Sequence, residues 1–244
     1  MVRLQNAEGF ALPCGGTEAM VYSPENRSQG IRAMADQHQI ATAADLRRLF
    51  GHAGGLAAKK SLPALDRHAR DYIARSPFLC IATSGHGGRA DVSPRGDQPG
   101  FVQVLDDRTI AIPDRPGNNR LDTMENILVN PNVGLIFLIP GFEDTLRING
   151  KATITADPAV LERATVDRKA PKVAIRVAVE ESFFHCAKAF RRSRLWQPDA
   201  IVDRSVMPTL ARIIMEQTSN APLRDEEVVA CDVAIEENYR TELY

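Results

Sequence analysis

The chain reads DVSPRGDQPGFV over residues Asp91–Val102 and IPDRPGNNRLDTMENILVNP over residues Ile112–Pro131. In both segments proline and glycine follow a short strand pattern, and in the second a helical pattern begins directly afterwards. The first N–H groups of a helix lack intrahelical partners and carry a partial positive charge. Together the two segments predict a polar cradle for a ligand that has a phosphate group and a flat ring system.

The second segment contains Arg120, which the pattern places in the first turn of a helix over residues 118–129. An arginine there can donate charge-assisted, bidentate hydrogen bonds to a phosphate. A cation is otherwise disfavoured at a helix N-terminus, so its presence indicates an anionic ligand. The alternative is that Asn118 or Asn119 only caps the helix and that Arg120 is a solvated surface charge.

The first segment ends its strand with a hydroxyl, a cation, a flexible backbone position and a carboxylate, in Ser93, Pro94, Arg95, Gly96 and Asp97. Proline restricts and glycine frees the backbone, which lets main-chain groups approach a flat ring. The alternative is an ordinary loop with an Arg–Asp surface pair. Because two such segments follow consecutive predicted strands, we favour one shared ligand site.

A third cluster, over Phe183–Trp196, mixes basic and aromatic residues. Such a mixture can bind nucleic acid by stacking and charge. It can also frame a flavin, with Trp196 near the ring and Lys188 or an arginine at the phosphate. In a third interpretation the phenylalanines are core and the arginines are solvated. The cations are Lys188, Arg191, Arg192 and Arg194, and the aromatics are Phe183, Phe184, Phe190 and Trp196.

Composition narrows the classes of function. The formal net charge of -1 over 244 residues gives no large field to attract nucleic acid or an anionic membrane. The longest apolar run, Val133–Ile139, falls far short of the ~20 residues that cross a bilayer. The N-terminus does not resemble a secretory signal, so we expect a cytoplasmic protein with no nucleic-acid or membrane partner.

Neither a metal site nor a common catalytic motif is predicted. The cysteines Cys14, Cys80, Cys186 and Cys231 form no CxxC pair, and His185 next to Cys186 has no second ligand pair at a suitable spacing. The glycine-rich dinucleotide motif, the P-loop and the Gly-x-Ser-x-Gly elbow are also missing from the sequence. No side chain stands out as an acid, a base or a nucleophile, so the catalytic residues stay unassigned.

Periodicity predicts a mainly β (α+β) fold. Short antiparallel strands with local turns, interrupted by one helix, favour a small barrel. We divide the chain into an extension over residues 1–41, a ligand-binding domain with its leading helices over 42–200, and a helical segment packed on the barrel over 201–244. The expected strands are 78–83, 90–94, 100–105, 109–113, 133–139, 145–155 and 172–180, and the expected helices begin at Thr42 and span 63–75, 118–129, 206–217 and 225–242.

The motifs SPRGD-x-PGF, IPDRPGN-x-R-x-DT and FFHCAKAF-x-RS-x-LW occur in this order, and the chain ends ENYRTELY. With them the chain resembles the pyridoxamine 5′-phosphate oxidase-related, FMN-binding split-barrel flavoproteins from about Thr42 to Tyr244. True oxidases of pyridoxamine phosphate read Ser/Thr-Arg-Lys where this chain has Asn119-Arg120-Leu121. The resemblance therefore does not imply activity on vitamin B6.

The resemblance implies a six-stranded antiparallel split β-barrel with peripheral helices and a homodimer with FMN at each of two interface sites. Residues Ser93, Arg95, Gly96 and Asp97 would lie along the isoalloxazine and ribityl parts of FMN, and Asn119 and Arg120 would meet its phosphate. Lys188, Arg191, Arg194 and Trp196 would reach the site, from the same or the partner subunit.

These features lead to the hypothesis of an FMN-dependent oxidoreductase acting on a small-molecule substrate. Two alternatives stay open on the same fold. One is a non-catalytic flavin or haem carrier, and the other is a reductase that uses a deazaflavin in place of FMN.

Overall fold

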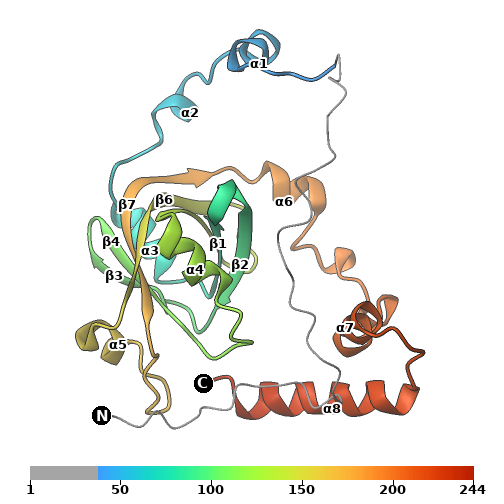
Figure 1. The fold of residues 1–244 in the computed structure, drawn as a ribbon. Coiled ribbons are helices and arrows are strands. Elements are labelled where there is room, and N and C mark those ends of the chain that lie inside the picture. The colour runs from blue at the N-terminus through green and yellow to red at the C-terminus, as the bar shows by residue number, and fades with distance from the viewer. Residues whose placement is uncertain (1–37) are drawn as a thin grey trace. The chain divides into compact units, whose positions relative to one another are not determined.

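The computed structural model describes residues 38–244, which divide into two units, residues 38–60 and residues 61–244 (Figure 1). Residues 1–37 of the predicted extension, including Cys14, lie outside the described residues. In the smaller unit the helix expected at Thr42 is confirmed as α1 (Ala43–Phe50), and the Thr42 hydroxyl accepts a hydrogen bond from the Asp45 N–H. The predicted boundaries at residues 41/42 and 200/201 stay predictions.

The larger unit is built on one antiparallel sheet in the order β2-β1-β5-β6-β7-β4-β3. Of the strands that follow one another along the chain, β1–β2, β3–β4, β5–β6 and β6–β7 pair in the sheet, whereas β2–β3 and β4–β5 do not (Figure 1). The strands are β1 (Phe78–Ser84), β2 (Ala90–Gly96), β3 (Gln103–Asp106), β4 (Thr109–Pro113), β5 (Asn132–Leu138), β6 (Thr145–Thr155) and β7 (Ala174–His185).

The count of six strands taken from the resemblance is wrong, because the sheet has seven. Each of the seven segments with a strand pattern forms one strand, so the periodicity of the sequence was the better guide. The order begins at β2 and ends at β3, and within the described residues the ladder therefore has two edges. The mainly antiparallel α+β class is confirmed.

Alternation along the strands builds the core, since every second side chain points to the same face of a sheet. In β7 the side chains of Ile175, Val177 and Val179 are buried, while Arg176, Ala178 and Glu180 between and after them are exposed. The same core contains fully buried side chains from the strands β1, β4, β5 and β6, including Leu79, Ile81, Ile110, Ile112, Phe137, Leu146 and Ile148.

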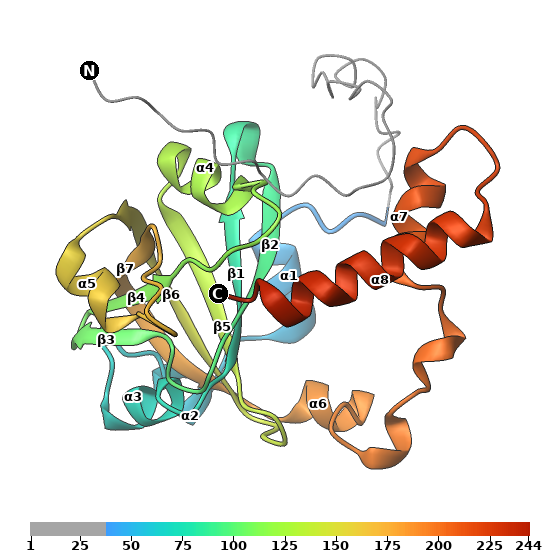
Figure 2. The same ribbon diagram turned by 90° about the horizontal axis from the view of Figure 1, so that it is seen from below.

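Two helices of the larger unit, α3 and α4, pack against strands of this sheet. The helix α4 packs against β1, β2 and β6, and α3 packs against β7 (Figure 2). The helix expected over residues 63–75 is shorter, because Asp66 accepts a hydrogen bond from the Ala69 N–H and caps it there. The remaining bounds are α2 (Leu56–Lys59), α3 (Arg67–Ile73), α4 (Asp122–Val129), α5 (Pro158–Arg163), α6 (Lys188–Ser193), α7 (Leu210–Thr218) and α8 (Asp225–Thr241), with short 3-10 turns η2 (His86–Gly88), η3 (Pro198–Ala200) and η4 (Arg204–Val206).

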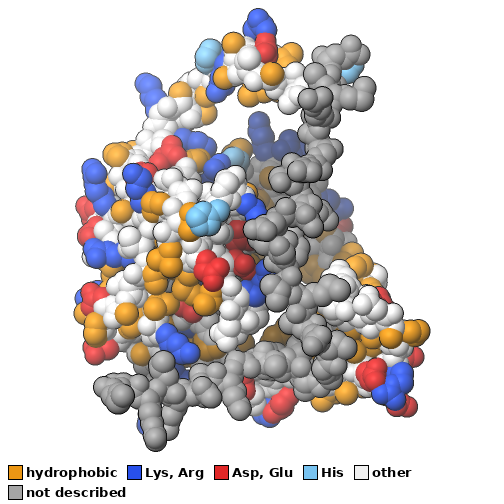
Figure 3. Space-filling view, viewed as in Figure 1, with side chains coloured by type: hydrophobic (Ala, Val, Ile, Leu, Met, Phe, Trp, Pro, Cys, Tyr) orange, Lys and Arg blue, Asp and Glu red, His pale blue; other side chains and the backbone are white. Residues whose placement is uncertain are grey.

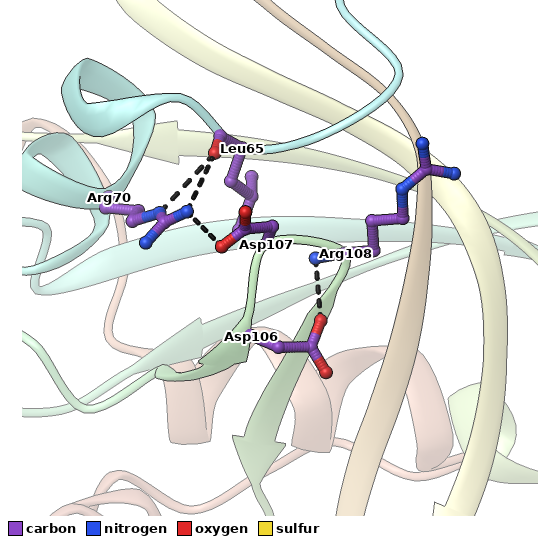
Figure 4. Close-up of polar contacts among 5 residues, drawn as sticks. All are labelled: Leu65, Arg70, Asp106, Asp107 and Arg108. Carbon is purple, nitrogen blue, oxygen red and sulfur yellow. Dashed lines mark hydrogen bonds and ion pairs between the residues drawn. The ribbon is translucent and has the colours of Figure 1, made fainter.

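The turn between β3 and β4 is bonded to the start of α3 (Figure 4). Arg70 forms an ion pair with Asp107, and its Nε and Nη2 atoms each lie 3.4 Å from the Leu65 carbonyl oxygen. The Leu65 N–H donates to the Asp107 carbonyl at 2.8 Å, and the Arg108 N–H donates to Asp106 Oδ1 at 2.7 Å. The turn expected at Asp106 and Asp107 is thus confirmed and fixed from both sides.

The long pair β6–β7 contains a bulge between Asn149 and Gly150. Glu181 lies opposite Asn149 and Val179 opposite Gly150, so Glu180 is the extra residue. At this point the strands approach so closely that a Cβ atom on Gly150 would lie 2.1 Å from the Ala178 carbonyl oxygen.

Replacing Gly150 with alanine tests this close approach. We expect Gly150→Ala to lower the free energy of unfolding by about 1–3 kcal/mol, because the backbone of β7 must move to accept the methyl group. Denaturant unfolding measures the change. The control is Gly54→Ala, which would place a Cβ with nothing within 4 Å; an equal effect of the two substitutions would contradict the bulge geometry.

Candidate binding pocket

A pocket of about 360 Å³ lies between the two segments that the sequence predicts to form a ligand site, Asp91–Val102 and Ile112–Pro131. One wall is β2, from Asp91 to Arg95, and the other is the loop after β4 with the first turn of α4. Four of the predicted site residues line it together, namely Ser93, Arg95, Asn119 and Arg120. The predicted meeting of the two segments is therefore what the structure shows.

The β2 wall carries its polar side chains on the side that faces the core. Ser93 is opposite Ile81 on β1, and Arg95 is opposite Leu79. Opposed residues of an antiparallel pair share one face of the sheet, and both β1 partners are fully buried. Half-buried polar groups in such a position need polar partners, which a ligand in the pocket can supply.

Arg95 has a donor without a protein acceptor. Its Nε atom is buried and makes no hydrogen bond with any described residue. Beside it on the pocket wall, burial raises the pKa of Asp114, while the positive charges of Arg95, Lys172 and Arg115 act in the opposite direction. The pocket thus pairs an unsatisfied cation with a carboxyl group that is costly to ionise.

The helix after the second segment starts later than predicted. The structure begins α4 at Asp122, so the placement of Arg120 in its first turn is wrong, and neither Asn118 nor Asn119 is its cap. Asn119 and Leu121 have φ angles of 55° and 59°, which interrupt the helical path. Leu121 occupies the capping position and makes no side-chain cap bond, which leaves the first N–H groups of α4 without that partner.

Arg120 is held by the acid that starts the helix. Its Nε lies 2.8 Å from Asp122 Oδ2, and its backbone N–H donates to Asn118 Oδ1 at 3.2 Å. The hydrogen bond from Arg120 holds the pKa of Asp122 below its ordinary value. The guanidinium therefore stays at the mouth of the pocket through an exposed ion pair.

Asp97 has a different environment from the other SPRGD residues. It does not line the pocket, and its side chain is only 2% exposed. Its Oδ2 accepts from Arg115 Nε at 2.6 Å, and its Oδ1 accepts from the Tyr244 hydroxyl at 2.6 Å and from the Gln98 N–H at 2.7 Å. Burial by itself raises the pKa of Asp97, but the bonds from Tyr244, Gln98 and Arg115 outweigh it and hold the pKa below its ordinary value.

Sequence reasoning missed three residues of this region: Asp114, Arg115 and Tyr244. Arg115 lines the pocket, donates to the Ala164 carbonyl at 2.8 Å and lies over the Tyr244 ring. Both Asp114 and Arg115 stand inside the IPDRPGN motif, so their motif was noticed but not their side chains. Nothing in the sequence indicates that Tyr244 reaches Asp97.

The third predicted cluster does not line this pocket in the chain. Arg191 pairs with Glu143 at 2.7 Å, and Arg194 pairs with Asp199. The Trp196 indole N–H donates to the Phe142 carbonyl at 2.7 Å. Lys188 starts α6 and is exposed.

The surface shown in Figure 3 carries acidic and basic side chains interspersed rather than a field of one sign. In residues 38–244, no helix is both long and apolar enough to cross a membrane. No group of three or more His, Cys, Asp or Glu residues in the same range could hold a metal ion.

Comparison with known families identifies the pocket-bearing unit. The sequence model described as pyridoxamine 5′-phosphate oxidase matches residues 65–186, which is half of the chain. The chain belongs to the pyridoxamine 5′-phosphate oxidase family. The matched residues of this family include β2, the loop after β4 and α4, so the resemblance inferred from the motifs is confirmed.

Solved structures with similar folds share about half of this chain. HupZ of Group A Streptococcus is 20% identical, with a TM-score of 0.42 over 49% of this chain and 93% of its own. A putative pyridoxamine 5′-phosphate oxidase of Lactobacillus delbrueckii is 19% identical (TM-score 0.40; 51% and 98%). An FMN-binding protein of Syntrophomonas wolfei is 14% identical (TM-score 0.40; 48% and 84%). No curated protein gave a match.

The buried pair between Asp97 and Arg115 predicts a loss of stability when the charge is removed. Asp97→Asn lowers the free energy of unfolding at pH 7 by about 1.5–3 kcal/mol, the range for hydrogen bonds to charged groups. Denaturant unfolding measures it. The control is Asp71→Asn, because Asp71 and Arg75 form an exposed pair at 3.6 Å that contributes less than about 0.5 kcal/mol.

The same pair predicts a pH dependence. The folded pKa of Asp97 lies below the unfolded value of about 3.9, so its stabilisation is present above about pH 4 and is lost as the pH falls through the folded pKa. The stability difference between the wild type and Asp97→Asn should therefore shrink in unfolding curves recorded from pH 6 down to pH 3. A difference that stays constant over this range contradicts the assignment.

Proposed function

We propose that the chain binds FMN in the pocket between β2 and α4 and acts as an FMN-dependent oxidoreductase on a small-molecule substrate. The observation that carries the proposal is the meeting of both motifs in a pocket where Arg95 has a buried donor with no protein partner. Family membership supports the same conclusion. The pocket volume of about 360 Å³ is in the range of small-molecule sites.

The residues present fit a phosphorylated ligand. Arg120 and Asn119 are assigned to the phosphate, together with the N–H groups of Asp122 and Thr123 at the uncapped start of α4. A phosphate there would compete with Asp122 for the guanidinium of Arg120, which an exposed ion pair permits at small cost.

The β2 wall fits the remainder of FMN. Ser93 is assigned to the ribityl chain as a hydrogen-bonding hydroxyl. Gly96 ends β2 and does not line the pocket in the single chain, and its close backbone approach to the ring stays a prediction. Arg95 is assigned to the ring edge, where a fixed positive charge stabilises negative charge that develops during reduction. Bound FMN supplies the hydride or electron transfer itself. The chain's own residues bind the cofactor, orient it and fix the charges around it.

Asp97 acts in this proposal through Arg115 rather than on the ligand. Both of its oxygens are already hydrogen-bonded within the protein. Because Asp97 does not line the pocket, we assign it to holding Arg115 on the pocket wall, and its direct contact with FMN stays a prediction.

We also propose a homodimer, in which Lys188, Arg191, Arg194 and Trp196 of one subunit approach the pocket of the other. Exposed apolar side chains support this: Val92 and Leu121 in the pocket lining are 65% and 48% exposed, and Leu128 on α4 is 77% exposed. Exposed apolar groups that cluster at one place are typical of interfaces. Light scattering of the purified protein should give twice the monomer mass of 26.8 kDa.

The two alternatives, a non-catalytic flavin or haem carrier and a deazaflavin-dependent reductase, differ from the proposal in chemistry that can be measured. None of the residues that line the pocket is a histidine, the common protein ligand of haem iron. Its three arginines, beside three aspartates, can donate to a phosphate. A deazaflavin also carries phosphate, so competition between FMN and a deazaflavin for the protein decides between them. Turnover of a reductant with FMN bound separates an enzyme from a carrier.

Binding of FMN is the first test of the proposal. The purified protein is expected to quench FMN fluorescence in a saturable titration with one site per chain, because the pocket sequesters the ring. Visible absorption of the protein as isolated gives a second reading. A colourless protein that leaves FMN fluorescence unchanged contradicts the proposal.

Substitutions in the pocket test the assigned contacts. Arg95→Ala and Arg120→Ala should each weaken FMN binding about 10- to 100-fold, because a charge-assisted hydrogen bond contributes ~1.5–3 kcal/mol. The control is Arg240→Ala, which removes an exposed arginine paired with Glu237 on α8. Equal affinity in all three variants would exclude the phosphate and ring roles.

A further inference from the structure

Tyr244 lies three residues beyond α8 and contacts three segments that are distant in sequence. Its hydroxyl donates to Asp97 Oδ1 at 2.6 Å, and its carbonyl accepts from Lys169 Nζ at 2.6 Å. Its ring lies below Arg115, with the guanidinium carbon 5.3 Å from the ring centroid. These contacts place the residue after α8 against the ends of β2 and β4.

Tyr244 itself does not line the pocket, but both of its side-chain partners are next to it. Asp97 directly follows β2, two residues beyond Arg95, and Arg115 forms part of the wall. The guanidinium of Arg115 is fixed at Nε by Asp97, at Nη1 by the Ala164 carbonyl, and on one face by the Tyr244 ring. Tyr244 therefore supports the arginine both directly and through Asp97.

The hydroxyl of Tyr244 matters because Asp97 is almost fully buried. Without it, Oδ1 keeps only the N–H of Gln98, and a buried carboxylate loses one of its donors. The carboxylate is then held by two donors instead of three, so the acceptor that orients Arg115 Nε is less rigidly fixed. Cation–π contact from the ring is a weaker and less directional restraint.

We propose that Tyr244 is a positioning residue of the pocket, which fixes Arg115 on the pocket wall by donating to Asp97 and by covering the guanidinium. Ligand affinity then depends on a side chain at the far end of α8, outside the pocket. This inference rests on the proposed function for its affinity readout, and it has a second readout in the protein without ligand.

The affinity test uses Tyr244→Phe in the full chain, which removes the hydroxyl and keeps the ring. Fluorescence titration should show FMN binding weakened about 3- to 10-fold, the effect of one lost hydrogen bond of ordinary strength. Tyr239→Phe on α8 is the matched control, since Tyr239 is 49% exposed and does not line the pocket between β2 and α4. It should bind FMN as the wild type does.

A double-mutant cycle shows whether Tyr244 acts through Asp97. In the Asp97→Ala background, Tyr244→Phe should add less than a twofold further loss of affinity, because the alanine has already removed the acceptor of the Tyr244 hydroxyl and the acceptor of Arg115 Nε. Fully additive losses overturn the proposal, since they mean that Tyr244 acts by another route.

Hydrogen–deuterium exchange of the protein without ligand separates this proposal from the proposed function. Tyr244→Phe should speed amide exchange in residues 114–124, relative to the wild type and Tyr239→Phe, while the unfolding temperature changes little. Faster exchange supports the positioning role even if the wild type binds no FMN, in which case only the proposed function fails. Unchanged exchange in this segment overturns the role of Tyr244 whatever the affinity shows.

Discussion

The ion pair between Asp97 and Arg115 joins the two segments from which the pocket is built. One partner follows the edge strand β2 and the other follows β4, which is next to the opposite edge strand β3, so this contact sets the distance between the pocket walls. The cost of burying a carboxylate is offset by three donors, which is the condition for a buried charge to be tolerated. The positions of Arg115, of the loop to α4 and of the helix start all depend on it.

Besides this ion pair, the pocket depends on polar residues on the inner face of the edge strand β2. A β2 with apolar residues at 93 and 95 would complete the core against Leu79 and Ile81. With serine and arginine there, the core stops at β1 and a polar cavity begins. The sheet of the family's fold thus provides the frame, and the two polar residues Ser93 and Arg95 on β2 turn part of its inner face into a binding pocket.

Much of the fold could be predicted from the sequence, because period-two patterns and Gly/Pro turns are local signals. Each of the seven predicted strand segments overlaps one observed strand, although β3 begins at Gln103 and not at residue 100. The alternating pattern of β7 ends at the bulge at Glu180, and the strand continues beyond it to His185. The start of α4 could not be predicted, since nothing local reveals left-handed backbone at Asn119 and Leu121. The expectation of six strands came from the resemblance to the family, whereas the alternating pattern of this sequence predicted seven.

The candidate site was predicted less completely. Ser93, Arg95, Asn119 and Arg120 meet as the motifs indicated, because their backbone positions follow from strands and loops. The partner of Asp97 could not be chosen from the sequence, where Arg95 is nearer than Arg115. The contact between Tyr244 and Asp97 was still harder to predict, since 147 positions separate the two residues. Long-range contacts of this kind depend on how helices return to the sheet, which no local pattern records.

The most direct test of the account is a crystal structure of the protein grown with FMN. We predict the phosphate within hydrogen-bonding distance of Arg120 and the start of α4, and the ring along β2 with Arg95 at its edge. FMN bound elsewhere, or a pocket between β2 and α4 that holds only solvent at saturating FMN, would contradict the central claim.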